Sequence, residues 1–528
     1  MELWAKEWLE DQRNKGVKCL EIKQRGTKHY VYHSTTYWDK SQNKAIKTSK
    51  YIGKLDQVHG LIKSHEDSQR AIKPAKVKSV TEYGNALLLQ KAMNDLKPLL
   101  IKGFPDNWME IYSLSMLRVN GNVPLKRAES AWQKLYNVES ITPNLKSQNL
   151  SKLMQEVGSN RKGQSVVFKN LLDQSEQLVY DLSYMFSRSI SISQAEKGYN
   201  KDKIQLPQIN IVLLCNADTG LPTMIRSLPG SVKDITTLKN SLTEFDIHNK
   251  MLILDRGFFS EKTFTDLDKL EVSYLIPARR NSHYYDTRIH LNGHFRYHKR
   301  LIRCGSRKCK DKYLYLFEDQ ELLLEERNTI YDKLDRGELD KNGFDKNLKN
   351  AGRILILSNR KMSEQDAYEF YKKRDNVEKL FDTYKSTLYA DRLYLHSDES
   401  VFGHVFIAFL SLYAYCKIEA LLKKAKLNKK VTPIDLLFEF SKIYHIDFAE
   451  DSAVMEVPKK VRDLEIQLGL NLFPHVMRVK ALNITTTSIE WRQPYPILLP
   501  FKADSCIPLS LKGSIAWLGQ WLWCQLHG

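Results

Sequence analysis

The order of short β-rich segments between residues 176 and 276 constrains the fold of this chain more than any other feature. Six segments have the β-branched, aromatic or apolar composition of strands: residues 178–186, 190–193, 209–215, 221–228, 250–255 and 272–276. Helices are expected at residues 234–245 and 260–270. Three strands followed by alternating helices and strands predict an α/β fold with a mixed sheet.

The segments before this region differ from it and from each other. Residues 30–38 and 45–52 are rich in β-formers and flank the polar residues 39–43, which predicts a hairpin in a basic N-terminal segment. A helical region follows, because apolar residues recur there three and four positions apart. Its cationic face, around Lys126 and Arg127, permits two interpretations: helices that recognise DNA, or the solvated face of a linker domain.

Residues 279–350 interrupt the α/β pattern. Residues 279–312 carry eleven Lys or Arg and two Asp, interleaved with aromatic residues. A strand-like segment and an acidic helical segment follow, and the α/β pattern resumes at residues 353–357. We interpret this stretch as a β-rich domain inserted into the α/β core.

The predicted organisation therefore has seven parts. They are a β-rich DNA-binding segment (1–75), a helical DNA-binding or linker domain (76–175), the first part of the core (176–278), the insertion (279–350), the second part of the core (351–425), a helical region (426–475) and an atypical tail (476–528). The tail holds four of the nine tryptophans and few charges, so we interpret it as appended sequence. The alternative is a small C-terminal interaction module.

The charge of the chain indicates a polyanionic partner. The 81 Lys and Arg exceed the 62 Asp and Glu by 19, as in proteins that bind nucleic acid or an anionic surface. A membrane partner is not expected, because the start is charged and the longest apolar run, residues 401–416, is shorter than the roughly 18 residues of a spanning helix. That run predicts a buried helix. Seven cysteines without regular spacing favour a reducing cytoplasm.

Two aspartates interrupt apolar strand-like segments. Asp181 lies in the middle of residues 178–186, and Asp255 ends residues 250–255. A carboxylate in such a place needs a hydrogen-bonding partner or a cation. If the two strands are neighbours, about 4.8 Å apart, the carboxylates converge and a cation such as Mg²⁺ is needed between them. For either Asp alone, a turn or a salt bridge is the simpler explanation.

A third acid belongs to a helical pattern. Tyr371, Arg374, Glu378 and Lys385 fall within roughly 60° of one another on a helix surface at 100° per residue. The stripe presents a carboxylate for a metal, with a guanidinium, an ammonium and a phenol that suit phosphate oxygens. A solvated charged helix face is the alternative interpretation.

These blocks resemble bacterial insertion-sequence transposases of the DDE type. The spacing Tyr-x2-Arg-x3-Glu-x6-Lys at residues 371–385 is similar to the signature of that family, and residues 254–258 and 180–183 resemble the blocks around its second and first catalytic aspartates. Residues 229–238 resemble a further block between the two. The resemblance extends from about residue 30 to residue 474.

The resemblance implies a ribonuclease-H-like core, with the insertion placed before the helix that carries the Glu. It implies that Asp181, Asp255 and Glu378 are catalytic ligands of two Mg²⁺ ions, for which Mn²⁺ can substitute. It also implies that Tyr371, Arg374, Lys385 and the neighbouring Arg256 bind DNA phosphates. The partners are then terminal inverted repeats and target DNA, paired in a homodimer, with no membrane and no small-molecule substrate.

The function implied is metal-dependent strand cleavage and strand transfer, in a bacterial cytoplasm and at the nucleoid. Two alternatives are a catalytically silent DNA-binding repressor or architectural protein, and a metal-dependent nuclease that does not join strands. Some family members stack a tryptophan of the insertion on a flipped base, but residues 279–350 contain none. Tyr284, Tyr285, Phe295 or Tyr297 could replace it, and both a hairpin and a linear intermediate stay open.

Overall fold

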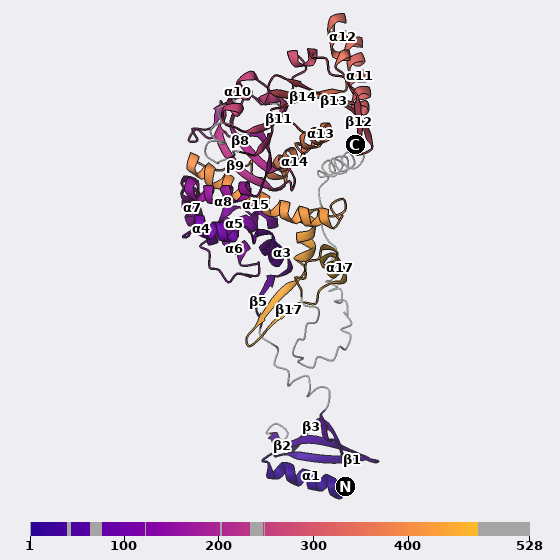
Figure 1. The fold of residues 1–528 in the computed structure, drawn as a ribbon. Helices are drawn as coiled ribbons and strands as arrows, with labels where there is room; N and C mark the ends of the chain where they lie inside the picture. The colour runs from indigo at the N-terminus through magenta and orange to yellow at the C-terminus, as the bar shows by residue number, and fades with distance from the viewer. Residues whose placement is uncertain are drawn as a thin grey trace, which may run out of the picture. The chain divides into compact units, whose positions relative to one another are not determined.

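The computed structural model describes residues 2–39, 44–63, 77–121, 123–200, 203–232, 247 and 249–473. The helix expected at residues 234–245, most of the predicted turn at 39–43, the end of the block at 229–238 and the tail at 476–528 lie outside these residues. Within them, the chain forms an N-terminal module, a helical region and a large mixed sheet (Figure 1).

The N-terminal module is a four-stranded antiparallel sheet with one helix. Its elements are α1 (Leu3–Asn14), β1 (Leu20–Arg25), β2 (Lys28–Asp39), β3 (Lys44–Asp56) and β4 (Gly60–Lys63). β2 pairs with β3, and Trp38 lies opposite Ala45. A small core of Ala5, Val31 and Leu55 joins α1 to the sheet. The sequence prediction treated this whole segment as β-rich and missed α1.

The helical region forms after a short strand. Its elements are β5 (Val77–Glu82), α3 (Gly84–Met93), α4 (Lys97–Gly103), α5 (Trp108–Gly121), η1 (Leu125–Arg127), α6 (Ala128–Trp132), α7 (Ser147–Ser159) and α8 (Arg161–Asp173). β5 pairs with the late strand β16 (Tyr444–Phe448), which also pairs with β17 (Ser452–Val454). One cluster of buried residues extends from Ala86 to Phe473, so this region shares its core with the sheet and the C-terminal helices.

The mixed sheet has the strand order β12-β13-β14-β15-β11-β10-β6-β8-β7, and β9 pairs with β8. Its first strands are β6 (Gln177–Phe186), β7 (Glu196–Lys197), β8 (Pro207–Asn216), β9 (Pro222–Pro229), β10 (Met251–Ile253) and β11 (Ser273–Pro277). Between the last two lie η2 (Arg256–Phe258) and α10 (Glu261–Lys269). β10 runs parallel to both β6 and β11, whereas β6, β8 and β9 pair antiparallel. The fold is therefore mixed α/β, as predicted.

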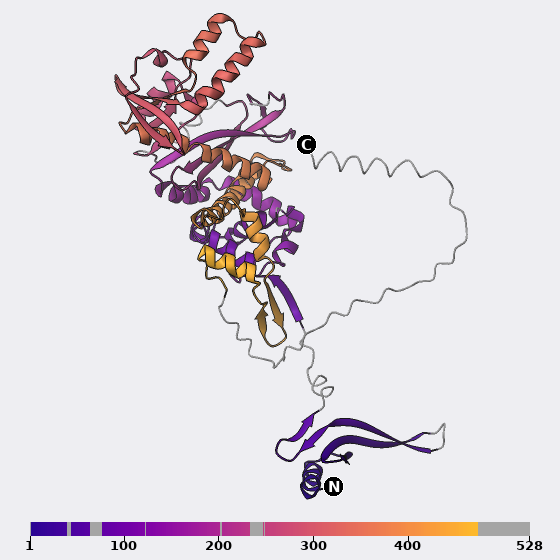
Figure 2. The same cartoon turned by 90° about the vertical axis from the view of Figure 1, so that its right-hand side faces the viewer.

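The predicted insertion does not form a sheet of its own. It contains η3 (His283–Asp286), β12 (Gly293–Tyr297), β13 (Arg300–Cys309), β14 (Lys312–Asp319), α11 (Gln320–Asp335) and α12 (Lys341–Lys349). β14 pairs with β15 (Arg353–Ser358), which pairs with β11, so β12 to β14 extend the central sheet. Backbone hydrogen bonds that β15 would otherwise leave open are satisfied in this way. α11 and α12 project at the end of this extension (Figure 2).

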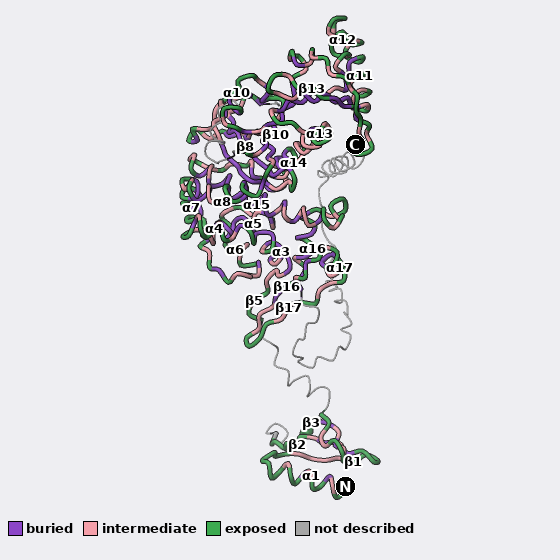
Figure 3. The backbone as a smooth tube through the Cα atoms, in the orientation of Figure 1, coloured by how far each residue is buried: buried purple, intermediate pink, exposed green. Residues whose placement is uncertain are grey.

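The remaining helices pack beside the sheet or on the helical region. They are α13 (Glu364–Lys372), α14 (Asp375–Asp382), the π-helical turn η4 (Thr383–Thr387), α15 (Asp398–Lys424), α16 (Pro433–Phe440) and α17 (Lys459–Leu468). α15 is long and apolar enough to cross a membrane, but 72% of its most apolar window is buried inside the protein. Figure 3 shows this burial, as expected for residues 401–416.

Candidate active site

Strand pairing brings Asp181 and Asp255 to neighbouring positions. β6 and β10 run side by side in parallel, with Val179 opposite Ile253. Each aspartate lies two residues farther along its own strand direction, and side chains on a strand alternate between faces with a period of two. The two carboxylates therefore extend from the same face of adjacent chains. This is the arrangement that the two sequence segments predicted conditionally.

The end of β10 is held by a tight turn. Asp255 is the N-cap of η2, and its Oδ2 accepts a hydrogen bond from the backbone N–H of Gly257 at 3.4 Å. Phe258 packs edge-on against Tyr180, with ring centroids 5.3 Å apart. The guanidinium of Arg279 donates to the carbonyl oxygen of Gly257 at 2.9 Å. The turn thus fixes Asp255 beside the strand that carries Asp181.

The predicted stripe does not lie on one regular helix. Ser363 caps the start of α13, and its hydroxyl accepts from the backbone N–H of Asp366 at 3.1 Å. The chain then turns at residues 373–374 before α14, and η4 widens the last turn. Tyr371 lies at the end of α13, Glu378 in α14 and Lys385 in η4. The single-helix expectation was wrong, because spacing alone does not reveal where the i to i−4 hydrogen bonding changes.

Arg374 connects two of the three acids. It forms ion pairs with the carboxylates of Asp255 and Glu378, the latter at 2.9 Å. Burial by itself would lower the pKa of Arg374, but the carboxylates of Asp255, Glu378 and Asp181 raise it above its usual value. The side chain is 19% exposed, whereas Glu378 is 54% exposed. A cation therefore already neutralises the carboxylate cluster.

The other predicted phosphate-binding residues surround this cluster. Lys385 donates to the hydroxyl of Ser183 at 2.8 Å, and its ammonium lies 4.8 Å from the ring centroid of Tyr184. Lys385 therefore approaches β6 two residues beyond Asp181. The ring centroid of Tyr371 lies 6.0 Å from the guanidinium of Arg374, and burial raises the pKa of the Tyr371 phenol. Arg256 is exposed.

Sequence reasoning missed two polar contacts at this site. Ser183 and Tyr184 are the partners of Lys385, and the ion pair of Lys373 with Asp218 at 2.6 Å ties the turn between α13 and α14 to the end of β8. The signal for the first was present, since Ser183 follows Asp181 by one strand period. The second depends on a tertiary contact that spacing does not predict.

The segment that carries this geometry matches a known family. Residues 172–414 match the model of the transposase DDE domain. The match contains Asp181, Asp255 and Glu378. The chain carries a transposase DDE domain. No curated protein matches it significantly.

Among the solved structures that match this chain is the cryo-EM structure of the piggyBac transposase synaptic complex with hairpin DNA, which is 12% identical, with a TM-score of 0.31 over 74% of this chain and 76% of that chain. The match over residues 172–414 supports a DDE transposase, an enzyme that acts on DNA.

DDE transposases use divalent metal ions, and the donor atoms here suit them. The three acids supply carboxylate oxygens, the ligands that Mg²⁺ prefers. In the described part of the chain, no three His, Cys, Asp or Glu residues lie close enough together to hold a metal ion. The reason is visible in the ion pairs, because the guanidinium of Arg374 lies between Asp255 and Glu378. The residues fit a metal by their chemistry, provided that Arg374 gives up these two carboxylates.

The four insertion aromatics are engaged in packing. Tyr284 is buried and donates to Glu261 at 3.0 Å, and the hydroxyl of Tyr285 accepts from the backbone N–H of Leu355 at 3.1 Å. Phe295 and Tyr297 both pack against the buried Tyr368 of the transposase, with centroids 5.5 and 5.3 Å away. In this structure the four rings therefore stabilise the fold.

A buried polar contact lies behind the site. His404, in the apolar helix α15, donates from Nε2 to the carbonyl oxygen of Ala390 at 2.9 Å, and Arg118 donates to its Nδ1 at 3.4 Å. Burial, aided by the cation of Arg118, lowers the pKa of His404 to about 3. The neutral imidazole thereby connects α5 and α15 to the chain that follows η4.

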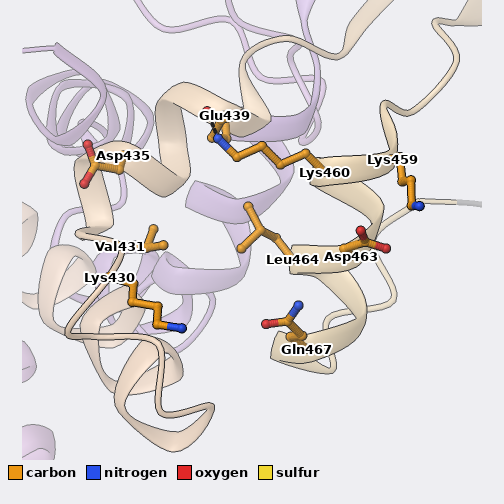
Figure 4. Close-up of a pocket in the computed structure, with 9 residues that line it drawn as sticks. All are labelled: Lys430, Val431, Asp435, Glu439, Lys459, Lys460, Asp463, Leu464 and Gln467. Atoms are coloured by element: carbon orange, nitrogen blue, oxygen red, sulfur yellow. Dashed lines mark hydrogen bonds and ion pairs between the residues drawn. The ribbon is translucent and has the colours of Figure 1, made fainter.

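A polar pocket of about 710 Å³ lies at α16 and α17 (Figure 4). None of the three acids lines it. Its acid Glu439 is paired with Lys442 and Lys460, both at 2.7 Å. The lysines already neutralise Glu439, so the pocket offers no carboxylate cluster comparable to the one around Arg374.

Proposed function

We propose that this transposase binds the terminal inverted repeats of an insertion sequence and catalyses cut-and-paste strand cleavage and strand transfer. Asp181, Asp255 and Glu378 are its catalytic residues and hold two divalent ions, Mg²⁺ or Mn²⁺. The observation that carries the proposal is the pairing of Asp255 and Glu378 with one guanidinium, beside Asp181 on the adjacent parallel strand β6. A mutually repelling set of anions is costly to assemble unless it serves a cation.

The strand order supports a ribonuclease-H-like core. β9, β8 and β6 are antiparallel neighbours, and β10 and β11 continue the sheet parallel to β6. In an open sheet of this kind, functional groups gather outside the carboxyl ends of the parallel strands. Asp255 follows the end of β10 in this way, with Asp181 beside it on β6.

The proposed roles follow from the chemistry of each side chain. Bound metal ions activate water, and then a 3′-hydroxyl, for in-line attack on a phosphodiester and stabilise the attacking and leaving oxygens. Glu378 is more exposed than Asp255, so it completes the set from the solvent side. Arg374, once freed from the carboxylates, grips a DNA phosphate with its planar fork.

The remaining cations and the phenol position DNA. Lys385 is a point charge close to Asp181, and Arg256 is exposed one residue after Asp255. Tyr371 keeps its proton, because burial raises its pKa, and so it donates to a phosphate oxygen. We propose that the enzyme pairs two transposon ends as a homodimer, at the nucleoid of a bacterial cytoplasm, with no membrane and no small-molecule substrate as partners.

One assay separates this function from a repressor and from a nuclease. A labelled transposon-end fragment, a supercoiled target plasmid and Mg²⁺ are mixed with the protein. Joined products support the transposase, cleavage alone supports a nuclease, and a gel shift without cleavage supports a repressor.

Substitution of the acids tests the site within the same assay. Asp181→Asn and Glu378→Gln remove metal ligands worth several kcal/mol of transition-state stabilisation, so we expect cleavage to fall by more than about 1,000-fold while end binding persists. Glu369→Gln, on α13, is the matched control and should cleave normally, because Glu369 pairs only with Gln365 among the contacts described. Full activity of either acid variant contradicts the assignment.

A further inference from the structure

The N-terminal module contains a two-stranded arm that its own core does not use. The arm comprises residues 33–38 of β2 and residues 44–50 of β3, which pair antiparallel from His33 opposite Lys50 to Trp38 opposite Ala45. Among the described residues, the module's core and the side chains packed on it lie outside residues 32–51. Helix α1 therefore covers only the base of the hairpin, and the arm extends beyond it (Figure 2).

Both faces of the arm are open to solvent. None of its residues is buried, and the aromatic side chains nearest the tip, Tyr37 and Trp38, are 53% and 59% exposed. The strands are joined across the arm by hydroxyl pairs, Ser34 with Ser49 at 2.7 Å and Thr35 with Thr48 at 3.0 Å. An isolated two-stranded ribbon is at best marginally stable in water, and exposed aromatics mark interaction surfaces. These features indicate that the arm binds a partner.

The charge of the arm identifies the chemistry of that partner. It carries Lys44, Lys47 and Lys50, and the one adjoining acid is Asp39, the last residue of β2, which lies opposite Lys44. Lys47 pairs with Glu21 of β1 at 2.8 Å, and the sheet base adds further cations such as Lys54. Helix α1, on the other side of the base, has Glu7, Glu10 and Asp11 against Lys6 and Arg13. A polyanion is therefore attracted to the ribbon and not to the helix.

We propose that the arm inserts into a groove of duplex DNA, with its lysines on the phosphates and Trp38 and Tyr37 against sugars and base edges. This inference rests on the proposed function, in which the protein binds DNA ends, and names the element that enters the groove. Two strands about 4.8 Å apart fit a major groove about 12 Å wide, which admits a β-ribbon. Seven residues at about 3.3 Å each give a reach of about 23 Å along it.

The test uses the full-length protein and a fluorescein-labelled random duplex of about 30 base pairs, in EDTA so that no chemistry occurs. Lys44→Gln/Lys47→Gln/Lys50→Gln is compared with Lys6→Gln/Arg13→Gln/Lys15→Gln, which removes the same charge from α1 and its C-cap. Each phosphate contact adds about 0.9 to the slope of log affinity against log salt. We expect the magnitude of this slope to be smaller by about 2 to 3 in the arm variant and by less than about 1 in the α1 variant.

The aromatic tip gives a second, charge-neutral measurement. Tyr37→Ala/Trp38→Ala should weaken duplex binding about tenfold with an unchanged salt slope, since it removes contacts and no charge. Circular dichroism and melting confirm that each variant is folded. Equal losses for the arm and α1 variants, a wild-type salt slope for the arm variant, unchanged binding by the aromatic variant, or stronger competition by single-stranded than by duplex DNA each overturn the proposal.

The two proposals fail in different ways. If Asp181→Asn still cleaves DNA while the arm variants bind weakly, the catalytic assignment is wrong and the arm stands. If the acid variants lose cleavage and the arm variants bind like the wild type, the arm proposal is wrong and the catalytic assignment is supported.

Discussion

Arg374 is the residue that balances the charge of the acidic cluster. It holds Asp255 and Glu378 by ion pairs, and its raised pKa reflects all three acids. An arginine remains charged at any working pH. It therefore stabilises the carboxylates without metal and competes with metal for two of them. Binding of a divalent ion and release of Arg374 for DNA are coupled in this arrangement.

We expect Arg374→Gln to melt at a lower temperature than the wild type in EDTA, because the carboxylates then repel one another without a counter-charge. Mg²⁺ should raise the melting temperature of this variant more than that of the wild type, since it no longer competes with a guanidinium. Thermal melting with and without Mg²⁺ measures both effects. Lys379→Gln, on the exposed side of α14, is the charge-matched control. An equal response to Mg²⁺ in wild type and variant contradicts the coupling.

Lys385 depends on the conformation of its element. It lies in the π-helical turn η4 and reaches Ser183 beside Asp181. A π-turn inside a helix often marks a functional site, because it costs regular hydrogen bonding. The turn directs the ammonium toward the strand from which an acid also extends.

We therefore expect Lys385→Ala to weaken binding of a transposon-end duplex by about tenfold or more, the scale of one hydrogen bond to a charged group. Lys379→Ala, six residues earlier on α14, should bind within about twofold of the wild type, as for a screened surface charge. Fluorescence anisotropy in EDTA measures both affinities. A loss for Lys379→Ala as large as that for Lys385→Ala would show that only net charge matters.

Helix α15 carries a pH-sensitive residue in its apolar core. The pKa of His404 is about 3 in the folded protein, because of burial and the cation of Arg118, and about 6.5 in an unfolded chain. Between these values the unfolded state binds a proton that the folded state does not. Stability is therefore lost as the pH falls below about 6.5.

At pH 5 this contribution is about 2 kcal/mol of unfolding free energy relative to pH 7. We expect His404→Gln, whose amide can still donate to the carbonyl oxygen of Ala390, to lose less stability over this interval than the wild type. Urea unfolding at pH 7 and pH 5 gives the difference between the two proteins. An identical pH dependence would mean that His404 does not remain neutral in the core.

In the molecule as a whole, the last described residue, Phe473, belongs to the main hydrophobic core. Phe473 is buried against Tyr83 and Phe440, and its backbone N–H donates to Glu465 at 2.7 Å. The segment after α17 thus packs on α16 and at the start of α3. The core cluster contains both, which agrees with one cooperative unit rather than separate helical domains.

A chain truncated after Pro474 should therefore keep its melting temperature within a few degrees and retain strand transfer. Truncation after Leu468 removes Leu470 and Phe473 from the core and should lower stability by several kcal/mol. Thermal melting and the end-joining assay compare the two proteins. Loss of folding in the longer variant would refute the interpretation of residues 476–528 as appended sequence.

Sequence patterning predicted elements better than their assembly. Five of the six strand-like segments became β6, β8, β9, β10 and β11, because composition and periodicity are local properties. The prediction of a strand at residues 190–193 was wrong, because these residues lie in turns before β7. The insertion was expected as a separate domain, yet its strands extend the central sheet. Pairing at a sheet edge is a long-range choice that the segments themselves do not encode. The helix α1 was missed because its apolar face is short.

Residue types and their spacing were enough to identify the side chains that carry the chemistry: two acids within or at the end of apolar strands, and a Tyr-Arg-Glu-Lys spacing. Only the tertiary structure decided that β6 and β10 are neighbours, that the stripe is divided between two helices and a π-turn, and that Arg374 occupies the space among the acids. The physical reason is that side-chain type is set residue by residue, whereas counter-charge and strand partner are set by packing between segments more than 70 residues apart, such as Asp181 and Asp255.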